Sequence, residues 1–468
     1  MPINKSIRSN FINDYIIYGA GEAGKQMYQS LKLNNKKIFC FIDDNEEKQS
    51  KFLFRKKIIS SSKFEQILKI QDFSNLIIAI PTLDNKNFLK IKNKYKKKIP
   101  NIEYIPLKNK LKSDIISLSD LSNLEINSIL KRKSKNINYD LLNDNLKNKS
   151  ILITGGGGSI GSQLCRNLLN IKCKKIVILD NSELNIFHFK KEMVRFKKVK
   201  FFLGDILDVE YLDNLMKKEK INIIFHAAAY KHVNILEENV HAAIRNNIFG
   251  TKNVLNVAKR YKKISVITIS TDKAVKPKNV LGITKRVSEL IALAYNDKNF
   301  NSKVVRFGNV FGSKGSAVPT FINQINEGMP ITITNKKAKR YFMTINEACF
   351  LLLLSVKIKN PKNVLVLKMG KQIKILEIIN HLIKIKKNLN KDYKFKIKQI
   401  GLKNGEKISE ELSISKKLNR TSVNDINVTN DPKYTKKKIL ELLYLIENNN
   451  NYQERFKEIK FFLKKELS

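Results

Sequence analysis

Residues 151–161 read Ile-Leu-Ile-Thr-Gly-Gly-Gly-Gly-Ser-Ile-Gly, and this stretch decides the fold of most of the chain. The apolar run at its start predicts a buried strand, and the glycines predict a tight turn into a helix beginning near Ser162. Glycines with this spacing let the backbone approach a pyrophosphate and let helix and strand pack closely. The stretch therefore predicts a dinucleotide-binding Rossmann unit, with cofactor contacts at Gly155, Gly158, Ser159, Ile160 and Gly161.

Acidic residues close the next two predicted strands. Asp180 ends the strand at 175–180, where its carboxylate can accept hydrogen bonds from an adenosine ribose. A carboxylate there favours NAD over NADP because it would repel a 2′-phosphate. Asp205 and Ile206 follow the third strand, where an adenine ring would lie. The alternation of strand and helix predicts a parallel α/β sheet, with strands at 151–154, 175–180, 200–204, 221–226, 264–270 and 303–307.

Two later strand ends carry residues suited to chemistry. Ala227 and Ala228 follow the strand at 221–226, and side chains this small leave room for a nicotinamide ring. Asp272 and Lys273 are neighbours after the strand at 264–270, so an acid and a base stand together at one edge of the sheet. An exposed Asp–Lys pair without function is the commoner fate of such neighbours. The spacing alone leaves both interpretations open.

The first hundred residues show a weaker version of the same pattern. Gly19-Ala-Gly-Glu-Ala-Gly24 follows an apolar run and precedes a helical pattern, and Asp43 ends the next predicted strand. This predicts a small Rossmann-like domain, either nucleotide-binding or with a purely structural turn. The predicted domains are 1–106, a linker at 107–149 with one or two helical segments, a dehydrogenase-like domain at 150–429 whose C-terminal part is smaller, and a charged helical tail at 430–468.

The charge balance is unusual. The 468 residues include 89 Lys and Arg against 42 Asp and Glu, a formal net charge of +47. Such an excess suits nucleic-acid binding, but Lys, Asn and Ile share A/T-rich codons. The Lys runs at 94–98 and 436–438 also include little Arg and few aromatic residues. We therefore expect no nucleic acid partner, although peripheral contact with an anionic membrane suits this charge.

The cysteine spacing and the lengths of the apolar runs indicate the cellular compartment of the protein. The four cysteines are scattered without a C-x-x-C pair, which is typical of a reducing cytoplasm and predicts no metal site. No apolar run reaches the roughly 18 residues of a membrane helix, and the N-terminus lacks the apolar stretch of a signal peptide. We expect a cytoplasmic protein without a transmembrane segment.

Six motifs occur in order along the chain: TGGGGSIGS at 154–162, HAAAYKHV at 226–233, STDKAVKP at 270–277, VRFGNVFGSKGS at 305–316, RYFMTINEA at 340–348 and GLKNGEKISEEL at 401–412. With them the chain resembles the nucleotide-sugar 4,6-dehydratases of the polysaccharide-biosynthesis family, which are extended short-chain dehydrogenases/reductases. The first domain resembles the extra domain of the long family members. Those members usually add an N-terminal bundle of membrane helices, and we expect a form without it.

The resemblance implies a cofactor, NAD, and a reaction. The sugar is oxidised at C4, loses the C5 proton and the C6 hydroxyl, and is reduced at C6. Asp272 would be the acid at O6, Lys273 the base at C5, and Lys285 would hold the nicotinamide ribose. Leu281 stands where the superfamily has a tyrosine. The long members of the dehydratase family also have an apolar residue at this position. The O4 proton would then pass through Thr271 to Asp272 or to a water, and an inactive scaffold is the alternative.

The resemblance also implies a UDP-sugar substrate, most simply UDP-N-acetylglucosamine with the C5 configuration retained, for surface polysaccharide synthesis. A C5-inverting dehydratase and a 4-epimerase are the alternatives within the superfamily, and a homo-oligomer is expected. The last motif departs from the family pattern at Lys403 and Asn404, which weakens substrate recognition there. The residues implied to bind substrate are Lys231, Asn309 (at the diphosphate), Arg340 (near the nucleotide) and Glu406.

Overall fold

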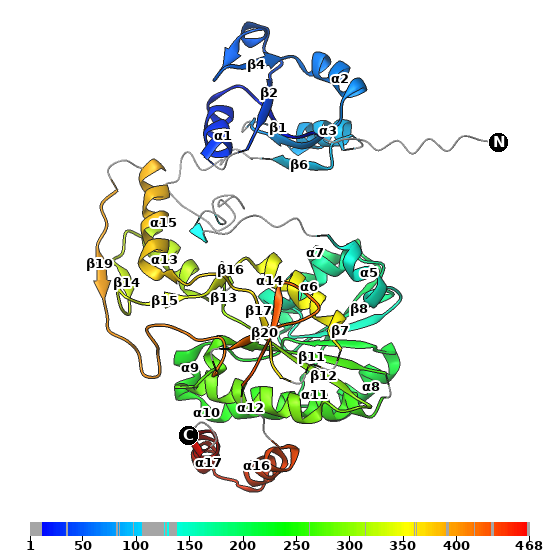
Figure 1. The fold of residues 1–468 in the computed structure, drawn as a ribbon, viewed down its shortest axis with the longest axis vertical. Helices are drawn as coiled ribbons and strands as arrows, with labels where there is room; N and C mark the ends of the chain where they lie inside the picture. Colours follow the sequence, from blue (N-terminus) through cyan, green and yellow to red (C-terminus); the bar gives the residue numbers. More distant parts are fainter. Residues whose placement is uncertain are drawn as a thin grey trace, which may run out of the picture. The chain divides into compact units, whose positions relative to one another are not determined.

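The computed structural model describes residues 12–465 except 34–35, 81–82, 84, 97, 105–125, 127–128, 131–137, 262, 314, 360, 362, 390–392, 416 and 432–434. The chain divides into two compact units, Met1–Ile115 and Ile116–Ser468 (Figure 1). Most of the predicted linker at 107–149 lies outside the described residues, and its described part contains one helix, α5 (Asp140–Leu146).

The smaller unit is an α/β sandwich, and the predicted Rossmann-like fold is confirmed. Its six strands lie in the order β3-β4-β2-β1-β5-β6, parallel except for the β3–β4 pair. Gly19 has a φ of +112°, and a Cβ there would lie 2.4 Å from the carbonyl oxygen of Ala79. The elements are β1 (Ile12–Tyr18), α1 (Glu22–Leu33), β2 (Ile38–Ile42), η1 (Glu46–Lys48), β3 (Phe52–Leu53), β4 (Lys56–Ile59), α2 (Ser61–Ile70), β5 (Phe73–Ile78), α3 (Asn85–Tyr95) and β6 (Asn101–Tyr104).

The larger unit is built on a nine-stranded sheet with the order β20-β21-β17-β12-β11-β10-β7-β8-β9. The strands from β17 to β9 are parallel, and β21 and β20 are antiparallel additions at one edge. The strand order reverses between β7 and β10, which is where a doubly wound sheet binds its ligand. The strands are β7 (Ser150–Thr154), β8 (Lys175–Asp180), β9 (Val199–Leu203), β10 (Ile223–His226), β11 (Ser265–Thr271), β12 (Asn301–Phe307), β17 (Leu365–Leu367), β20 (Leu418–Arg420) and β21 (Ile426–Thr429).

Helices cover both faces of this sheet, as the repeated alternation of strand and helix requires. One apolar cluster packs α8, α11, α12, α16 and α17 against the sheet, and another packs α5, α6, α7 and α14. Their bounds are α6 (Ser159–Leu169), α7 (Glu183–Met193), α8 (Val209–Glu219), α9 (Val233–Glu238), α10 (Val240–Ala243), η3 (Ile244–Phe249), α11 (Gly250–Lys259), η4 (Asp272–Ala274), α12 (Val280–Tyr295), α14 (Ile345–Leu354), η5 (Ser355–Lys357), α16 (Lys436–Asn448) and α17 (Tyr452–Lys465).

A smaller C-terminal part stands beside the large sheet, as predicted. It has its own apolar cluster around α13 (Ala317–Asn326) and α15 (Ile375–Leu389). Three two-stranded sheets belong to it or join it to the Rossmann part. Their strands are β13 (Asn309–Val310) with β16 (Phe342–Met343), β14 (Ile331–Ile333) with β19 (Ile397–Gln399), and β15 (Lys339–Arg340) with β18 (Ile373–Lys374).

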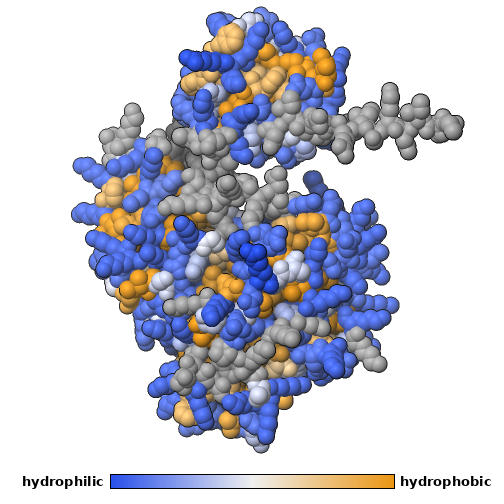
Figure 2. Space-filling model, viewed as in Figure 1, coloured by the Kyte–Doolittle hydropathy of each residue, from blue (hydrophilic) through white to orange (hydrophobic). Residues whose placement is uncertain are grey.

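The surface is mainly hydrophilic on the face shown in Figure 2, with hydrophobic residues in smaller patches. This agrees with a chain that carries 89 Lys and Arg residues. Within the described residues, no helix is both long and apolar enough to cross a membrane.

Candidate active site

The glycine turn after β7 forms a cradle at the point where the strand order reverses. Gly155 has a φ of +62°, and a Cβ there would lie 2.7 Å from the Ala228 backbone. A Cβ on Gly161 would lie 2.4 Å from the Gly155 carbonyl oxygen, so the helix could not approach the turn. Helix α6 begins at Ser159, three residues earlier than predicted, because the helical backbone follows directly after the extended N-cap residue Gly158. No side chain caps its N-terminus, which leaves backbone N–H groups for an anion.

Acidic residues border this cradle. Asp180, at the end of β8, is buried, and its two carboxylate oxygens accept from the N–H groups of Gly157 and Ser182, both at 2.9 Å. Asp205, after β9, accepts from the N–H of Leu207 at 2.9 Å. Ile206 is buried and packs against Gly250 in the core, so any contact with a cofactor would fall to its backbone.

Two polar residues that sequence reasoning gave no role fix the loop after β10. His226 is fully buried between Thr154 and Thr251, with ring nitrogens 2.8 and 3.0 Å from their hydroxyls. Burial lowers its pKa to about 3, so the ring is neutral. Asn247 accepts from the Tyr230 N–H at 2.9 Å and donates to the Tyr230 carbonyl at 3.1 Å. The small-residue loop with Ala227 and Ala228 is therefore held open beside the glycine turn.

The catalytic pair predicted from sequence lies at the end of β11. Asp272 is fully buried, and its Oδ1 accepts from the Thr271 hydroxyl and from Lys273 Nζ, both at 3.0 Å. Its Oδ2 has no hydrogen-bond partner among the described residues. Lys273 Nζ also donates to Asn309 Oδ1 at 3.1 Å. Asn309 thus orients the side chain of Lys273 in this structure. From the sequence, Asn309 was predicted to contact the substrate's diphosphate.

Helix α12 brings Leu281 and Lys285 to the same site. Leu281 is buried in an apolar cluster with Leu236, Ala243 and Val280, which confirms that nothing here replaces the tyrosine's hydroxyl at that position. Lys285 is 5% exposed, and burial lowers its pKa from 10.5 to about 8, against the opposing charge of Glu289. Across the described part of the chain, Lys285 makes no hydrogen bond or ion pair. Its ammonium is free to bind hydroxyl groups of a ligand.

Residues predicted to contact substrate converge from distant parts of the chain. Arg340, on β15, donates to Glu406 Oε1 at 2.9 Å and to the Ile408 carbonyl at 3.0 Å. Thr334 donates to the same Glu406 oxygen at 2.8 Å. Lys231 lies exposed in the loop after β10. Arg340 and Glu406 were each predicted to bind substrate, but the contact between them was not predicted.

The segment 405–411 covers the catalytic loop. The Gly405 carbonyl accepts from Asn279 at 3.1 Å, and Lys407 Nζ donates to the Val275 carbonyl at 2.6 Å. Glu410, which sequence reasoning did not single out within its motif, is 4% exposed. Its pKa is raised by burial first and by the charge of Asp272 second. The motif marked the segment, but only the fold shows that this carboxyl is buried, 3.7 Å from Lys407 Nζ.

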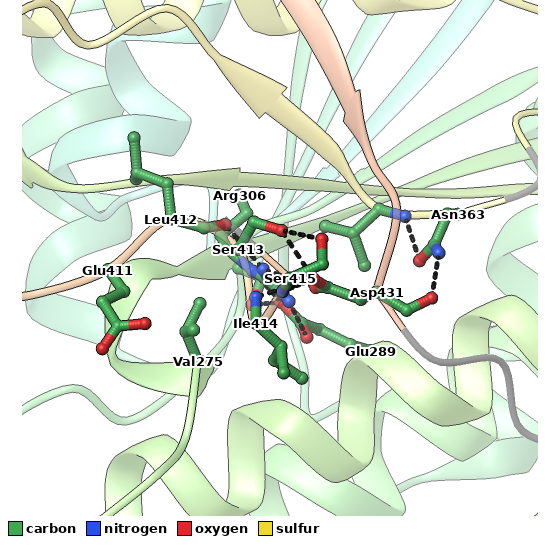
Figure 3. Close-up of polar contacts among 12 residues, drawn as sticks. Val275, Glu289, Arg306, Asn363, Glu411, Leu412, Ser413, Ile414, Ser415 and Asp431 are labelled. Carbon is green, nitrogen blue, oxygen red and sulfur yellow. Dashed lines mark hydrogen bonds and ion pairs between the residues drawn. The ribbon is translucent and has the colours of Figure 1, made fainter. Parts of the chain in front are cut away.

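A buried ionic network anchors the next residues of that segment (Figure 3). Arg306, on β12, donates twice to Glu289 of α12, at 2.9 and 2.7 Å, and once to Asp431 at 3.2 Å. It also donates to the Leu412 carbonyl at 2.7 Å, while Ser413 donates to Asp431 at 2.6 Å. All three charged groups are buried. The network therefore fixes the path of the chain directly after Glu410.

These residues fit a dinucleotide. Gly155 and Gly161 have no space for a Cβ, and the N–H groups at the start of α6 suit a pyrophosphate. Asp180 ends β8 close to the turn, and the side chain of Lys285 is buried.

Comparison with known proteins agrees with this geometry. The family model described as "Polysaccharide biosynthesis protein" matches residues 151–431. The capsular polysaccharide biosynthesis protein CapD of Staphylococcus aureus is 36% identical over 85% of this chain and 68% of its own length. A UDP-glucose 4-epimerase of Rickettsia bellii is 36% identical over 58% of this chain and 79% of its own.

Among solved structures, Pen from Bacillus thuringiensis superposes with a TM-score of 0.57 and 32% identity, covering 65% of this chain and 99% of its own. The family model covers most of the larger unit. The chain belongs to the polysaccharide biosynthesis protein family, within the extended short-chain dehydrogenases/reductases.

Proposed function

We propose that this chain is an NAD⁺-dependent nucleotide-sugar 4,6-dehydratase that acts on UDP-N-acetylglucosamine in surface polysaccharide synthesis. The observation that carries the proposal is the ion pair of the buried Asp272 with the half-buried Lys273 at the end of β11, the second strand from the glycine turn across the sheet. The similarity to a capsular polysaccharide biosynthesis protein supports the proposed role in surface polysaccharide synthesis.

The cofactor would be held by the residues already described as its cradle. When bound, NAD⁺ would supply the redox chemistry, since the hydride taken from C4 would later be returned to C6, so no reduced cofactor would accumulate. Asp180 would accept hydrogen bonds from the adenosine ribose, and Lys285 would donate to the nicotinamide ribose.

The acid and base steps fall to neighbouring side chains. Water is a poor leaving group, so the hydroxyl at C6 needs a proton as its bond to carbon breaks. Asp272 would donate that proton, and Lys273 would remove the proton from C5 when its ammonium has lost its own. Thr271 donates to Asp272 at 3.0 Å, so it links the C4 hydroxyl to that carboxylate. Because Leu281 has no hydroxyl, the O4 proton would leave by this route or to a water.

The substrate side of the proposal rests on four residues. Arg340 offers a planar fork of donors that suits a phosphate, with Glu406 and Thr334 holding it in place. Lys231 would add positive charge from the loop after β10, and Asn309 would contact the diphosphate while it orients Lys273.

A 4-epimerase is the second candidate, because the Rickettsia bellii relative carries that name. An epimerase oxidises C4 and reduces it again but leaves C6 unchanged. It would need no acid at O6, so the buried Asp272 favours the dehydratase.

Incubation with UDP-N-acetylglucosamine and NAD⁺ is expected to give a product lighter by one water, with a C6 methyl signal by NMR. In D₂O the product should carry deuterium at C5, because Lys273 exchanges its proton with solvent, and the coupling constants should show the original C5 configuration. Inversion at C5 would indicate the inverting dehydratase. A product of unchanged mass with an intact CH₂OH group would indicate the epimerase, and the dehydratase proposal would be wrong.

Lys285→Met is expected to weaken NAD⁺ binding about ten- to a hundredfold, since charge-assisted hydrogen bonds contribute about 1.5–3 kcal/mol. The wild-type affinity should fall as the pH rises through about 8, because the ammonium loses its proton there. The variant should show no such fall. Isothermal titration calorimetry between pH 6.5 and 9 measures both effects.

Lys259→Met is the matched control, because it removes an ammonium that pairs with Asp297 on the surface. Its affinity for NAD⁺ should equal that of the wild type. An affinity of Lys285→Met within twofold of the wild type at pH 7 would contradict the assignment of Lys285 to the cofactor.

A further inference from the structure

Adjacent side chains of the segment 405–411 make contacts in two directions. Glu406 accepts from Arg340, the residue proposed to contact the substrate's nucleotide, at 2.9 Å. Lys407, the next residue, donates to the Val275 carbonyl at 2.6 Å, in the turn that follows the catalytic pair. One short segment therefore joins the proposed nucleotide end of the site to the loop that carries the proposed acid and base.

The turn after the catalytic pair has a strained backbone. Val275 follows the short helix η4, and its N–H donates to the Asp272 carbonyl at 3.0 Å. Lys276, the next residue, has a φ of +44°, in the left-handed region that residues other than glycine rarely adopt. A backbone in this region persists only where the surrounding contacts hold it. The position of the turn therefore depends on the groups that bind it.

Lys407 makes the best-enclosed of the side-chain contacts that hold this turn. Its side chain is 12% exposed, and the residue that it binds, Val275, is 0% exposed. The neighbouring pair of Lys276 with Glu411 measures 2.9 Å, but its side chains are 43% and 36% exposed. Exposed ion pairs contribute little because water competes with them. The contact from Lys407 to the carbonyl is therefore the stronger restraint on the turn.

Close backbone approaches confine the same loop. A Cβ on Gly405 would lie 2.6 Å from the Lys278 carbonyl oxygen, and the Gly405 carbonyl accepts from Asn279 at 3.1 Å. A Cβ on Gly282, at the start of α12, would lie 2.3 Å from the Lys273 carbonyl oxygen. The loop therefore packs tightly against both α12 and the segment that carries Lys407, so a displacement of that segment would reach the catalytic pair.

We propose that Lys407 is a positioning residue, which holds the strained turn at Val275 and so fixes the catalytic pair for the acid and base steps. This inference rests on the proposed function for the reaction that it affects. Asp272 and Lys273 both lie within η4, directly before Val275 in the same loop. Lys407 need not touch the sugar, because its effect passes through the backbone of η4. Its neighbour Glu406 anchors the segment at the proposed nucleotide end of the site.

Lys407→Met tests the proposal because it keeps an unbranched side chain of similar length and removes the donor. The kcat for 6-deoxy sugar formation should fall about ten- to a hundredfold, since a misplacement of about 1 Å in a catalytic group costs this much. The KM for UDP-N-acetylglucosamine should stay within about twofold of the wild type, because the contact between Glu406 and Arg340 is kept.

Two further variants accompany this measurement. Lys407→Arg keeps a charged donor and should recover most of the lost kcat. Lys384→Met removes an exposed ammonium on α15 and is the matched control, so it should leave kcat and KM unchanged. A kcat of Lys407→Met within twofold of the wild type would overturn the proposal, and so would a raised KM with an unchanged kcat.

Hydrogen exchange of the full chain, followed by mass spectrometry, tests the position of the loop without turnover. Peptides from residues 270–280 should exchange about tenfold faster in Lys407→Met than in the wild type, because the Val275 N–H loses protection as the turn opens. Peptides from residues 151–169 should exchange as in the wild type, which shows that the variant is folded.

The exchange data separate this proposal from the proposed function. Unchanged exchange at residues 270–280 in Lys407→Met would overturn the positioning role even if the enzyme makes its product. Faster exchange there, with a wild type that forms no 6-deoxy product, would support the restraint by Lys407 and contradict the dehydratase function.

Discussion

Asp272→Asn is expected to lower the rate of 6-deoxy sugar formation about a thousandfold, because general acid catalysis contributes about 10²–10⁴-fold. The amide keeps the size of the side chain and can still accept from Thr271 and Lys273. It cannot give a proton to the leaving hydroxyl. Product formation from UDP-N-acetylglucosamine, followed by NMR at the C6 methyl signal, measures the loss.

The affinity for NAD⁺ separates a chemical effect from a folding defect. Asp272→Asn should bind NAD⁺ within about twofold of the wild type, because Asp272 touches none of the cradle residues. Asp297→Asn is the control variant, since Asp297 forms a surface pair with Lys259. Its rate should match the wild type. A rate of Asp272→Asn within threefold of the wild type would show that another group protonates the leaving hydroxyl.

Glu289→Gln is expected to destabilise the larger unit by about 3–5 kcal/mol, because it removes a buried counter-charge that Arg286 and Arg306 share. Glu289 is fully buried and accepts from Arg286 at 2.8 Å and from Arg306 at 2.9 and 2.7 Å. Urea unfolding followed by near-UV circular dichroism measures the change in the transition of the larger unit.

The stability that Glu289 contributes depends on pH. Although burial opposes it, the two arginines lower the pKa of Glu289 from 4.5 to about 2. The stability that the network contributes is therefore present above about pH 4.5 and is lost as the pH falls toward 2. The variant should lack this part of the acid dependence.

A surface pair provides the comparison. Glu192→Gln removes a two-pronged contact with Arg166 on the surface and should cost no more than about 1 kcal/mol. Equal effects of the two variants would contradict the structural role of the buried network.

Local pattern predicted the parts of the site that depend on short stretches of chain. The glycine turn, Asp180 and the Asp272–Lys273 pair each follow a strand, and parallel strands bring their carboxyl ends to one edge. The predicted strands agree with the structure to within one or two residues. The start of α6 was predicted three residues too late because several consecutive glycines hide where the helical backbone begins.

Contacts between distant segments escaped prediction. The sequence marks Arg340 and Glu406 through their motifs, but nothing in it states that they bind each other. Asn309 contacts Lys273 because β13 follows β12, the strand next to β11. Lys407 and Glu411 contact Val275 and Lys276 because their segment folds back beside η4. The side chain of Ile206 lies in the core because α11 packs against it, and spacing along the chain does not encode that packing.

By itself the sequence determined that a Rossmann sheet would present a glycine cradle and an acid–base pair at one edge. This follows because strand period, turn chemistry and glycine conformation are local properties. The tertiary structure alone decided the electrostatics of that edge. Burial raises the pKa of Glu410, lowers the pKa of Lys285 and encloses Arg306 with Glu289 and Asp431. The energy of a charge depends on all the groups that surround it in space, so these properties arise only once the chain is folded.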